Sequence, residues 1–209
     1  MKPANRVTRD HWWWRPGWRQ GRSFYTWHLT FLEHPLVCQI ASDFACAAQG
    51  LDTLDLVSCD GIHLTVQGVG FADEVSLDDL EKIRESTRYH CSDVPPIEAS
   101  LGELRVDEET VQMDVGPSSE ILHLRTRIRE GIGDVWGSAN VPESLEGFRP
   151  HITLAYSNGT ARIGEIYATI SDVKIPSSSV LISSVSLIKL NRDRKRYEWD
   201  EVAKVPLGR

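Results

Sequence analysis

The hydrophobic and polar positions between Ser23 and the end of the chain follow two periods, one typical of strands and one typical of helices. Runs of aromatic and β-branched residues predict strands in SFYTWHLTFL, in the segment from about Leu54 to Gly70 (one strand or a hairpin of two), and in IEASLGELRV, ETVQMDV, RPHITLAYS, GEIYATI, VLISSVSLIKL and RYEWDEVAKV. A helical period predicts three helices, in HPLVCQIASDFACAAQG, SLDDLEKIREST and SSEILHLRTRIREGI.

The ends of two of these helices carry recognisable signals. Pro35 suits a first helical turn and Gly50 ends the first helix. Ser76 and Asp79 resemble a capping box at the start of the second. The order of strand, helix and strand occurs twice, so the elements predict two similar lobes in an α+β domain and not a doubly wound parallel sheet.

One short motif, His-x-Thr, occurs three times in predicted strands. Residues two apart in a strand face the same side, so each copy presents an imidazole beside a hydroxyl. The copies are His28-x-Thr30, His63-x-Thr65 and His151-x-Thr153. The second and third copies occupy equivalent places in the two lobes and are therefore expected to form a pair. The first is expected to belong to the scaffold, with His28 as a possible substrate contact.

Two facing His-Thr pairs suit the chemistry of phosphate esters. A neutral imidazole can take a proton from an attacking water or hydroxyl, and an imidazolium can donate one to the leaving oxygen. The two threonine hydroxyls can donate hydrogen bonds to the non-bridging oxygens, where negative charge accumulates. The sequence alone does not assign which histidine is the base and which the acid.

Composition limits the class of protein. The 209 residues are 41% hydrophobic and 25% charged, as in soluble globular proteins, and no apolar run reaches the ~20 residues of a membrane span. The N-terminus lacks an apolar signal core, so a cytoplasmic location is expected. Four cysteines without metal-ligand spacing are expected to be reduced thiols, and we expect no metal and no cofactor.

Residues 1–22 differ from the remainder and are expected to form an N-terminal arm, followed by one bilobal domain over residues 23–209. The net charge of the chain is −7. The arm holds six basic residues and one acid, a charge of +5, which leaves −12 for the remainder. Four of the seven tryptophans lie in HWWWRPGW. They suit packing of indoles on the domain surface, or stacking on nucleobases.

The segments IHLTVQGVGF and FRPHITLAYSNG resemble the paired HxT signatures of the two-histidine (2H) phosphoesterase superfamily, which includes 2′-5′ RNA ligases and cyclic nucleotide phosphodiesterases. The resemblance covers roughly Phe24 to Leu207 in element order. It implies a bilobal α+β fold in which two antiparallel sheets flank a central cleft, with helices outside. It also implies that the two pairs line this cleft and act without metal on 2′,3′-cyclic phosphates or 2′-5′ linkages. The residues concerned are His63 and His151 as catalytic groups and Thr65 and Thr153 as phosphate-binding groups.

The sequence departs from the family pattern after the second motif. Many bacterial relatives have a phosphate-binding arginine there, whereas this chain has Tyr156, which can stack on a base or donate its hydroxyl. Arg149 is either a further substrate contact or a solvated loop residue. Gln67 is either a substrate contact or a group that forms a hydrogen bond at the end of its strand. The basic NRDRK turn near the C-terminus suits either guidance of a polyanion or plain solvation.

The leading hypothesis is therefore a phosphodiesterase acting on a cyclic phosphate or 2′-5′ phosphodiester at a nucleotide or RNA end, with ligation as the reverse reaction. Two alternatives stay open: an enzyme of the same fold specialised for a small nucleotide-like metabolite, and a non-catalytic module that binds nucleotide or RNA ends. The expected partner is a nucleotide, an RNA end or a small phosphorylated metabolite, with no membrane partner. A monomer is the expected state.

Overall fold

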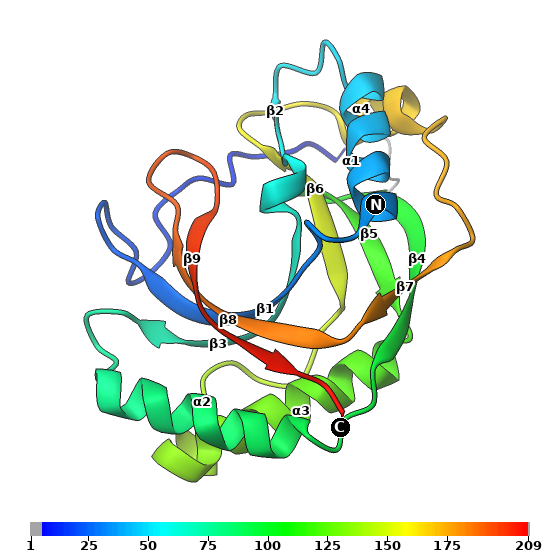
Figure 1. Ribbon diagram of the computed structural model, residues 1–209. Coiled ribbons are helices and arrows are strands. Elements are labelled where there is room, and N and C mark those ends of the chain that lie inside the picture. The colour runs from blue at the N-terminus through cyan, green and yellow to red at the C-terminus, as the bar shows by residue number, and fades with distance from the viewer. Residues whose placement is uncertain (1–5, 209) are drawn as a thin grey trace.

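The strands form two antiparallel sheets in the computed structural model, which describes residues 6–208 (Figure 1). One sheet has the order β3 (His63–Phe71), β1 (Phe24–Thr30), β8 (Ser184–Asn191), β9 (Glu198–Pro206). The other has the order β2 (Leu54–Leu56), β6 (His151–Ser157), β5 (Thr110–Gly116), β4 (Ile97–Val106), β7 (Ser179–Ile182). Each sheet holds one of the two paired His-x-Thr motifs, and the expected α+β fold of two antiparallel sheets is confirmed.

Within the described residues, four helices lie outside the sheets (Figure 1). They are α1 (Pro35–Ala47), α2 (Leu77–Cys91), α3 (Ser118–Trp136) and α4 (Ile163–Ile170), with short 3₁₀ turns η2 (Cys59–Gly61) and η3 (Ser138–Asn140). Helices α2 and α3 pack side by side and contact β9 and β3, whereas α1 and α4 lie together, with α4 against β4. No helix in the described part of the chain is long and apolar enough to cross a membrane.

The three expected helices are present, and their ends follow from local chemistry. Pro35 stands at the start of α1. The Ser76 side chain accepts a hydrogen bond of 3.0 Å from the backbone N–H of Asp79 and so caps α2. In α3, Ile121, Leu124 and Ile128 are fully buried, as their spacing predicts.

The segment GEIYATI is a helix and not the expected strand. Ile163, Ile166 and Ile170 lie three and four residues apart, and all three are buried on one face of α4. The high strand propensity of isoleucine, tyrosine and threonine suggested a strand, but the helical spacing of the buried positions determines the structure.

The segment VLISSVSLIKL is likewise two strands and not one. The chain leaves the five-stranded sheet after β7 and enters the four-stranded sheet at β8, with Ser183 between them. The segment from Leu54 to Gly70 crosses between the sheets in the same way, because β2 and β3 belong to different sheets. The chain therefore passes between the two sheets at several points, including from β1 to β2 and from β3 to β4.

Residues 6–22 of the N-terminal arm pack along the five-stranded lobe and reach the β8–β9 hairpin; residues 1–5 of the expected arm lie outside the described residues. Val7 forms a β-bridge with Arg162 beside α4. The backbone N–H of His11 donates to the carbonyl of Ser157 at the end of β6, at 2.8 Å. The indole of Trp12 is buried and donates to Asp55 at 2.7 Å.

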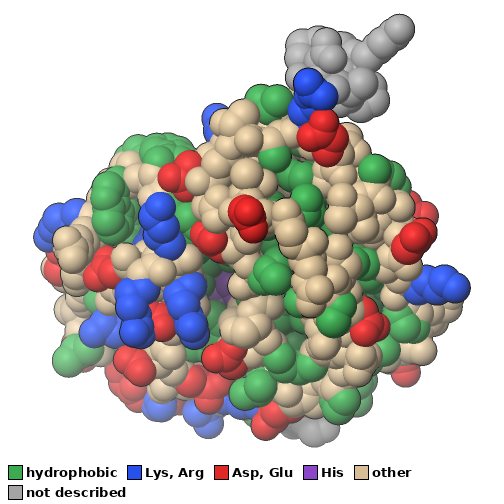
Figure 2. All heavy atoms as spheres, turned by 90° about the horizontal axis from the view of Figure 1, so that it is seen from above, with side chains coloured by type: hydrophobic (Ala, Val, Ile, Leu, Met, Phe, Trp, Pro, Cys, Tyr) green, Lys and Arg blue, Asp and Glu red, His purple; other side chains and the backbone are tan. Residues whose placement is uncertain are grey.

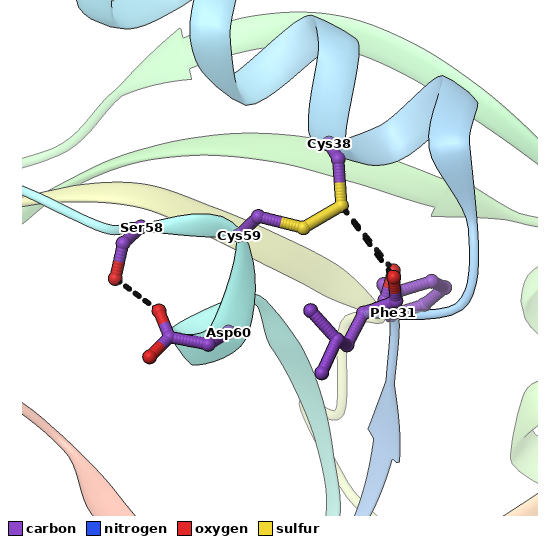
Figure 3. The surroundings of a disulfide bond; sticks show 6 residues. Phe31, Cys38, Ser58, Cys59 and Asp60 are labelled. Atoms are coloured by element: carbon purple, nitrogen blue, oxygen red, sulfur yellow. Dashed lines mark hydrogen bonds between the residues drawn. A yellow bond between two sulfur atoms is a disulfide. The ribbon is translucent and has the colours of Figure 1, made fainter.

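The expectation that all four cysteines are reduced is wrong for two of them. Cys38 of α1 and Cys59 of η2 form a disulfide with a Cα–Cα distance of 5.0 Å (Figure 3). These positions are 21 residues apart, and only the packing of η2 against α1 brings them together. Cys46 is exposed and Cys91 is buried, both as free thiols.

Candidate active site

Strands β3 and β6 contact each other where the two lobes meet, and both begin with a motif histidine. Both His-Thr pairs line one cavity of about 320 Å³. The other lining residues are His11, Arg15, Trp18, Phe24, Thr26, His28, Thr110, Glu143, Tyr156, Leu190, Arg192 and Tyr197. In the view from above, a histidine side chain is visible at the bottom of a recess, with Lys and Arg side chains gathered on one side (Figure 2).

The two motif histidines are held in the same way. Nδ1 of His63 lies 2.8 Å from the carbonyl oxygen of Gly61, and Nδ1 of His151 lies 2.8 Å from that of Arg149. A carbonyl oxygen only accepts, so Nδ1 carries the proton in both rings. Nε2 of each neutral imidazole is therefore free to accept a proton, and Nε2 of each imidazolium is free to donate one.

Burial sets the protonation state of His63. The side chain is 8% exposed, and this burial lowers its pKa from 6.5 to about 4. The hydrogen bond to Gly61 opposes the shift, and the nearby charge of His151 adds to it. His63 is consequently neutral near pH 7.

His28 lies directly against the motif of β3, although it was expected to belong to the scaffold. The antiparallel register of β1 and β3 pairs His28 with Thr65, and its Nε2 lies 3.1 Å from Oγ1 of Thr65. The rings of His28 and His63 are parallel, with centroids 4.3 Å apart. His28 is almost fully buried, and its pKa is lowered well below 6.5 by burial and by the neighbouring His63.

Tyr156 also lines the cavity, although its three-residue separation from Thr153 would place the two side chains on opposite faces of a regular strand. A register shift between β5 and β6 explains this: Val111 pairs with Ala155 but Gln112 pairs with Thr153. The Tyr156 ring is buried against His11, with centroids 4.4 Å apart. Burial raises the pKa of Tyr156 well above 10, so its hydroxyl keeps its proton.

Gln67 and Arg149 lie outside this cavity. Gln67 is fully buried, donates to the carbonyl of Pro142 at 2.7 Å and accepts from Arg125 Nε at 3.0 Å, so its amide offers no free group. The exposed Arg149 side chain pairs with Asp114 at 3.1 Å and lines a groove on the outer side of His151. Its backbone carbonyl, not its guanidinium, contacts the motif histidine.

Sequence reasoning missed the cavity residues that come from the arm and from the β8–β9 hairpin. His11, Arg15 and Trp18 extend from the arm into the cavity that contains both His-Thr pairs. Arg192, the first basic residue of the NRDRK turn, was expected near the tip of a charged hairpin and is only 3% exposed. The only sequence signal for these cavity residues was the cluster of four tryptophans interleaved with arginines in the arm.

Within residues 6–208, no three His, Cys, Asp or Glu side chains are grouped so as to hold a metal ion. The polar groups that converge on the cavity are instead imidazoles, hydroxyls and guanidiniums, with one carboxylate, that of Glu143. Such a set supplies proton transfer and hydrogen bonds to an anion.

Several solved structures share this fold with the chain at low sequence identity. TT0787 of Thermus thermophilus is 15% identical, with a TM-score of 0.68 and coverage of 88% of this chain and 97% of that one. A structure described as a phosphoesterase is 16% identical, with a TM-score of 0.64 and coverage of 90% and 99%. Escherichia coli LigT complexed with 3′-AMP is 16% identical, with a TM-score of 0.63 and coverage of 89% and 98%.

No curated protein sequence matches the chain. The family model of the 2′-5′ RNA ligase superfamily matches residues 47–194, which include both paired His-x-Thr motifs. This match spans more than half of the chain and agrees with the two-sheet fold. The chain therefore belongs to the 2′-5′ RNA ligase superfamily, within the two-histidine phosphoesterases.

Proposed function

We propose that the protein is a metal-independent phosphodiesterase that hydrolyses a 2′,3′-cyclic phosphate or a 2′-5′ phosphodiester of a nucleotide or RNA end. The observation that carries the proposal is the matched orientation of His63 and His151. Both rings line one cavity, both hold their Nδ1 proton against a backbone carbonyl, and both keep Nε2 free. Membership of a superfamily of phosphoesterases and ligases supports the same class of reaction.

In the proposed reaction, one imidazole takes a proton from water at Nε2 while the water oxygen attacks phosphorus. The bond between phosphorus and the leaving ribose oxygen breaks, and the second histidine, as imidazolium, donates its Nε2 proton to that oxygen. Thr65 and Thr153 donate their hydroxyl protons to hydrogen bonds with the non-bridging oxygens, where charge builds up. The reverse sequence joins two ends, so ligation uses the same groups.

The environment of His63 favours the role of general base for this residue. Its lowered pKa keeps the ring neutral, which a base requires before the reaction. A bound phosphate brings negative charge next to the ring and raises this pKa, which strengthens the base when the substrate arrives. His151 then serves as the acid.

The ligands of structural relatives support a nucleotide substrate. Escherichia coli LigT has been crystallised with 3′-AMP, with ATP, with phosphate and with NADP+. These ligands share a phosphate group, which is the group that two imidazoles and two threonine hydroxyls suit.

A second candidate, an enzyme of the same fold for a small nucleotide-like metabolite, is favoured by the size of the cavity. A volume of about 320 Å³ is at the lower end of the ~300–1,000 Å³ of small-molecule sites. The arm residues that line the cavity restrict it on one side.

The test is hydrolysis of a panel of 2′,3′-cyclic nucleotides and 2′-5′-linked dinucleotides in EDTA by the wild type, His63→Ala and His151→Ala. We expect turnover by the wild type and a loss of roughly 100-fold or more in each variant. His123→Ala, which changes an exposed histidine of α3, is the matched control and should retain full activity. Absence of wild-type turnover across the panel, or activity insensitive to both substitutions, would contradict the proposal. Tight binding of these nucleotides without turnover would instead identify a binding module.

A further inference from the structure

The arm side of the catalytic cavity contains a buried positive charge without an acidic partner. Arg192 is 3% exposed and lines the cavity, and no carboxylate of residues 6–208 lies within ion-pair distance of its guanidinium. Buried charges are normally paired, because an unpaired ion loses its hydration without compensation. An arginine kept in this state beside a reaction centre indicates that an anionic ligand supplies the missing charge.

The protein uses only part of the hydrogen-bonding capacity of this arginine. Nη2 of Arg192 donates to the carbonyl of His11 at 3.0 Å and faces that of Trp13 at 3.4 Å. A guanidinium has five N–H donors, and within the described chain Nε and Nη1 have no protein acceptor. The two carbonyls fix the arginine and leave these donors for a ligand.

Arg15 places a second positive charge in the same part of the cavity. It pairs with Glu109, which is also 2.9 Å from Arg9, so the acid is shared between two arginines. Arg9 is exposed and has a second carboxylate partner, Glu108, at 3.9 Å, so Arg15, Arg192 and Glu109 together leave a net charge of +1. Burial, and then the charges of Arg15 and Arg192, lower the pKa of His11 to about 4, as expected in a positive recess.

This positive recess adjoins the reaction centre through the ring of Tyr197, which lies near both. Arg192 lies 5.5–5.8 Å from the ring centroids of Trp12, Trp18 and Tyr197. The Tyr197 ring in turn lies 5.9 Å from that of His63. A reacting phosphate held by both motifs therefore leaves the recess for another group.

An apolar wall completes the cavity. Trp18 of the arm lies beside Phe24 of β1, with ring centroids 5.9 Å apart, and Leu190 is the cross-strand partner of Phe24. Flat apolar surfaces of this kind suit a nucleobase. The cavity thus offers separate surroundings for a reacting phosphate, a base and a second anion.

We propose that Arg192 and Arg15 bind a second phosphoryl group of the substrate, so that the preferred substrate is a nucleoside 2′,3′-cyclic phosphate of mononucleotide size that also carries a 5′-phosphate. This inference rests on the proposed phosphodiesterase function and deepens it. The same phosphate chemistry occurs at the end of an RNA strand, where the last internucleotide phosphate takes the place of the 5′-phosphate. The small cavity favours the free mononucleotide.

The kinetic test compares three substrates: adenosine 2′,3′-cyclic phosphate, the same compound with a 5′-phosphate, and a hexaribonucleotide that ends in a 2′,3′-cyclic phosphate. We expect the wild type to prefer the 5′-phosphorylated mononucleotide over the unphosphorylated one in kcat/KM by roughly 10- to 100-fold, the range for hydrogen bonds to a charged group. The hexamer should be a poorer substrate than the 5′-phosphorylated mononucleotide. No preference for the 5′-phosphate, or a preference for the hexamer, would overturn the inference.

Substitutions of the two arginines test whether the preference for the 5′-phosphorylated substrate depends on the recess. Arg192→Gln and Arg15→Gln should each lower the ratio between the two mononucleotides at least several-fold. Arg192→Lys, which keeps the charge, should lower it less. Arg194→Gln changes an exposed arginine of the same turn that pairs with Glu198, and should keep the wild-type ratio. Equal losses on both mononucleotides in Arg192→Gln and Arg15→Gln would show a structural role and contradict the proposal.

A binding measurement separates this inference from the proposed function. Calorimetry with adenosine 3′,5′-bisphosphate and with 3′-AMP requires no turnover, and thermal unfolding establishes that each variant is folded. Tighter binding of the bisphosphate by the wild type, lost in the folded Arg15→Gln variant, supports the recess even if no cyclic phosphate is hydrolysed. Turnover of cyclic phosphates with equal binding of both ligands would support the proposed function and refute the recess.

Discussion

The imidazole rings of His28 and His63 are parallel, with their centroids 4.3 Å apart, and Nε2 of His28 lies 3.1 Å from Oγ1 of Thr65. If Thr65 donates its proton to a phosphate oxygen, its hydroxyl oxygen must accept from His28, which requires the proton on Nε2. His28 is thus a positioning residue for both members of the first His-Thr pair.

We predict that His28→Leu lowers kcat by roughly tenfold, less than the ~100-fold or greater loss typical for removal of a direct oxyanion donor. His28→Gln can still donate from its amide and should retain more activity than the leucine variant. Steady-state kinetics on a cyclic nucleotide measure both. Equal kcat values for the two variants would show that the hydrogen bond to Thr65 does not contribute to turnover.

Three buried histidines predict a loss of stability in acid. The pKa values of His11 and His63 fall from 6.5 to about 4, and that of His28 falls well below 6.5, in each case chiefly through burial. Below pH 6.5 the unfolded chain binds protons that the folded chain does not, so unfolding is favoured progressively as the pH falls, for His11 and His63 until the folded pKa near 4 is reached. The stability is fully present above pH 6.5.

Chemical denaturation should therefore give an unfolding free energy roughly 3 kcal/mol lower at pH 5.5 than at pH 7.5, about 1 kcal/mol for each histidine. The same measurement on His28→Gln should show a decrease smaller by about 1 kcal/mol. Exposed His123→Gln is the control and should leave the pH dependence unchanged. An unfolding free energy that is constant between the two pH values would contradict neutral burial of these rings.

The disulfide predicts a definite thiol count. Without reductant, the unfolded protein should react with a thiol reagent at two cysteines, Cys46 and Cys91, and after reduction at four. Cys59→Ser should lower the unfolding free energy by roughly 3 kcal/mol, as expected for a closed loop of about 20 residues. Cys46→Ser, at an exposed free thiol, should have little effect. Four reactive thiols without reductant would show that the bond is absent from the purified protein.

The paired strands of the fold were predictable because a His-x-Thr motif within a period-two apolar run fixes which side chains share a face, as for His63 and Thr65. The face on which Tyr156 lies was not predictable, because the register shift between β5 and β6 leaves no local signal in the sequence. The same limit applies to contacts between distant segments. His11 and Arg192 are 181 positions apart, and their hydrogen bond depends on where the arm crosses the β8–β9 hairpin.

Gln67 illustrates a residue whose strand was predictable but whose face was not, because the β1–β3 pairing has a register shift between the partners of Thr65 and Gln67. It follows Thr65 on β3, yet its side chain faces a buried network with two arginines of α3. Arg125 and Arg129 donate to its Oε1 at 3.0 and 3.1 Å, and Arg129 also donates to the carbonyl of Pro142 at 2.7 Å. The network therefore connects β3 to the loop that leads into β6 and His151.

We predict that Gln67→Leu lowers the unfolding free energy by about 3 kcal/mol, because it leaves Nε of Arg125 without its buried acceptor and removes one acceptor from Arg129. For a chain of this length this corresponds to a decrease in Tm of roughly 10 °C. Lys82→Ala, which removes an exposed ion pair with Asp78, should change Tm little. An unchanged Tm in Gln67→Leu would mean that water replaces the lost amide.

The same variant tests whether this network positions the second motif. The loop after Pro142 ends at Arg149, whose carbonyl accepts the Nδ1 proton of His151 and so sets the direction of Nε2. Loss of the Gln67 amide should loosen this loop. Amide exchange in residues 142–149 should then become faster. At a temperature where the variant is still folded, kcat should fall, because His151 is held less precisely. A lower Tm with wild-type kcat and wild-type exchange would instead show that α3 stabilises the fold without orienting His151. In that case, the pairing of His151 with Asp114 across β5 and β6 is sufficient to hold the second motif without the Gln67 network.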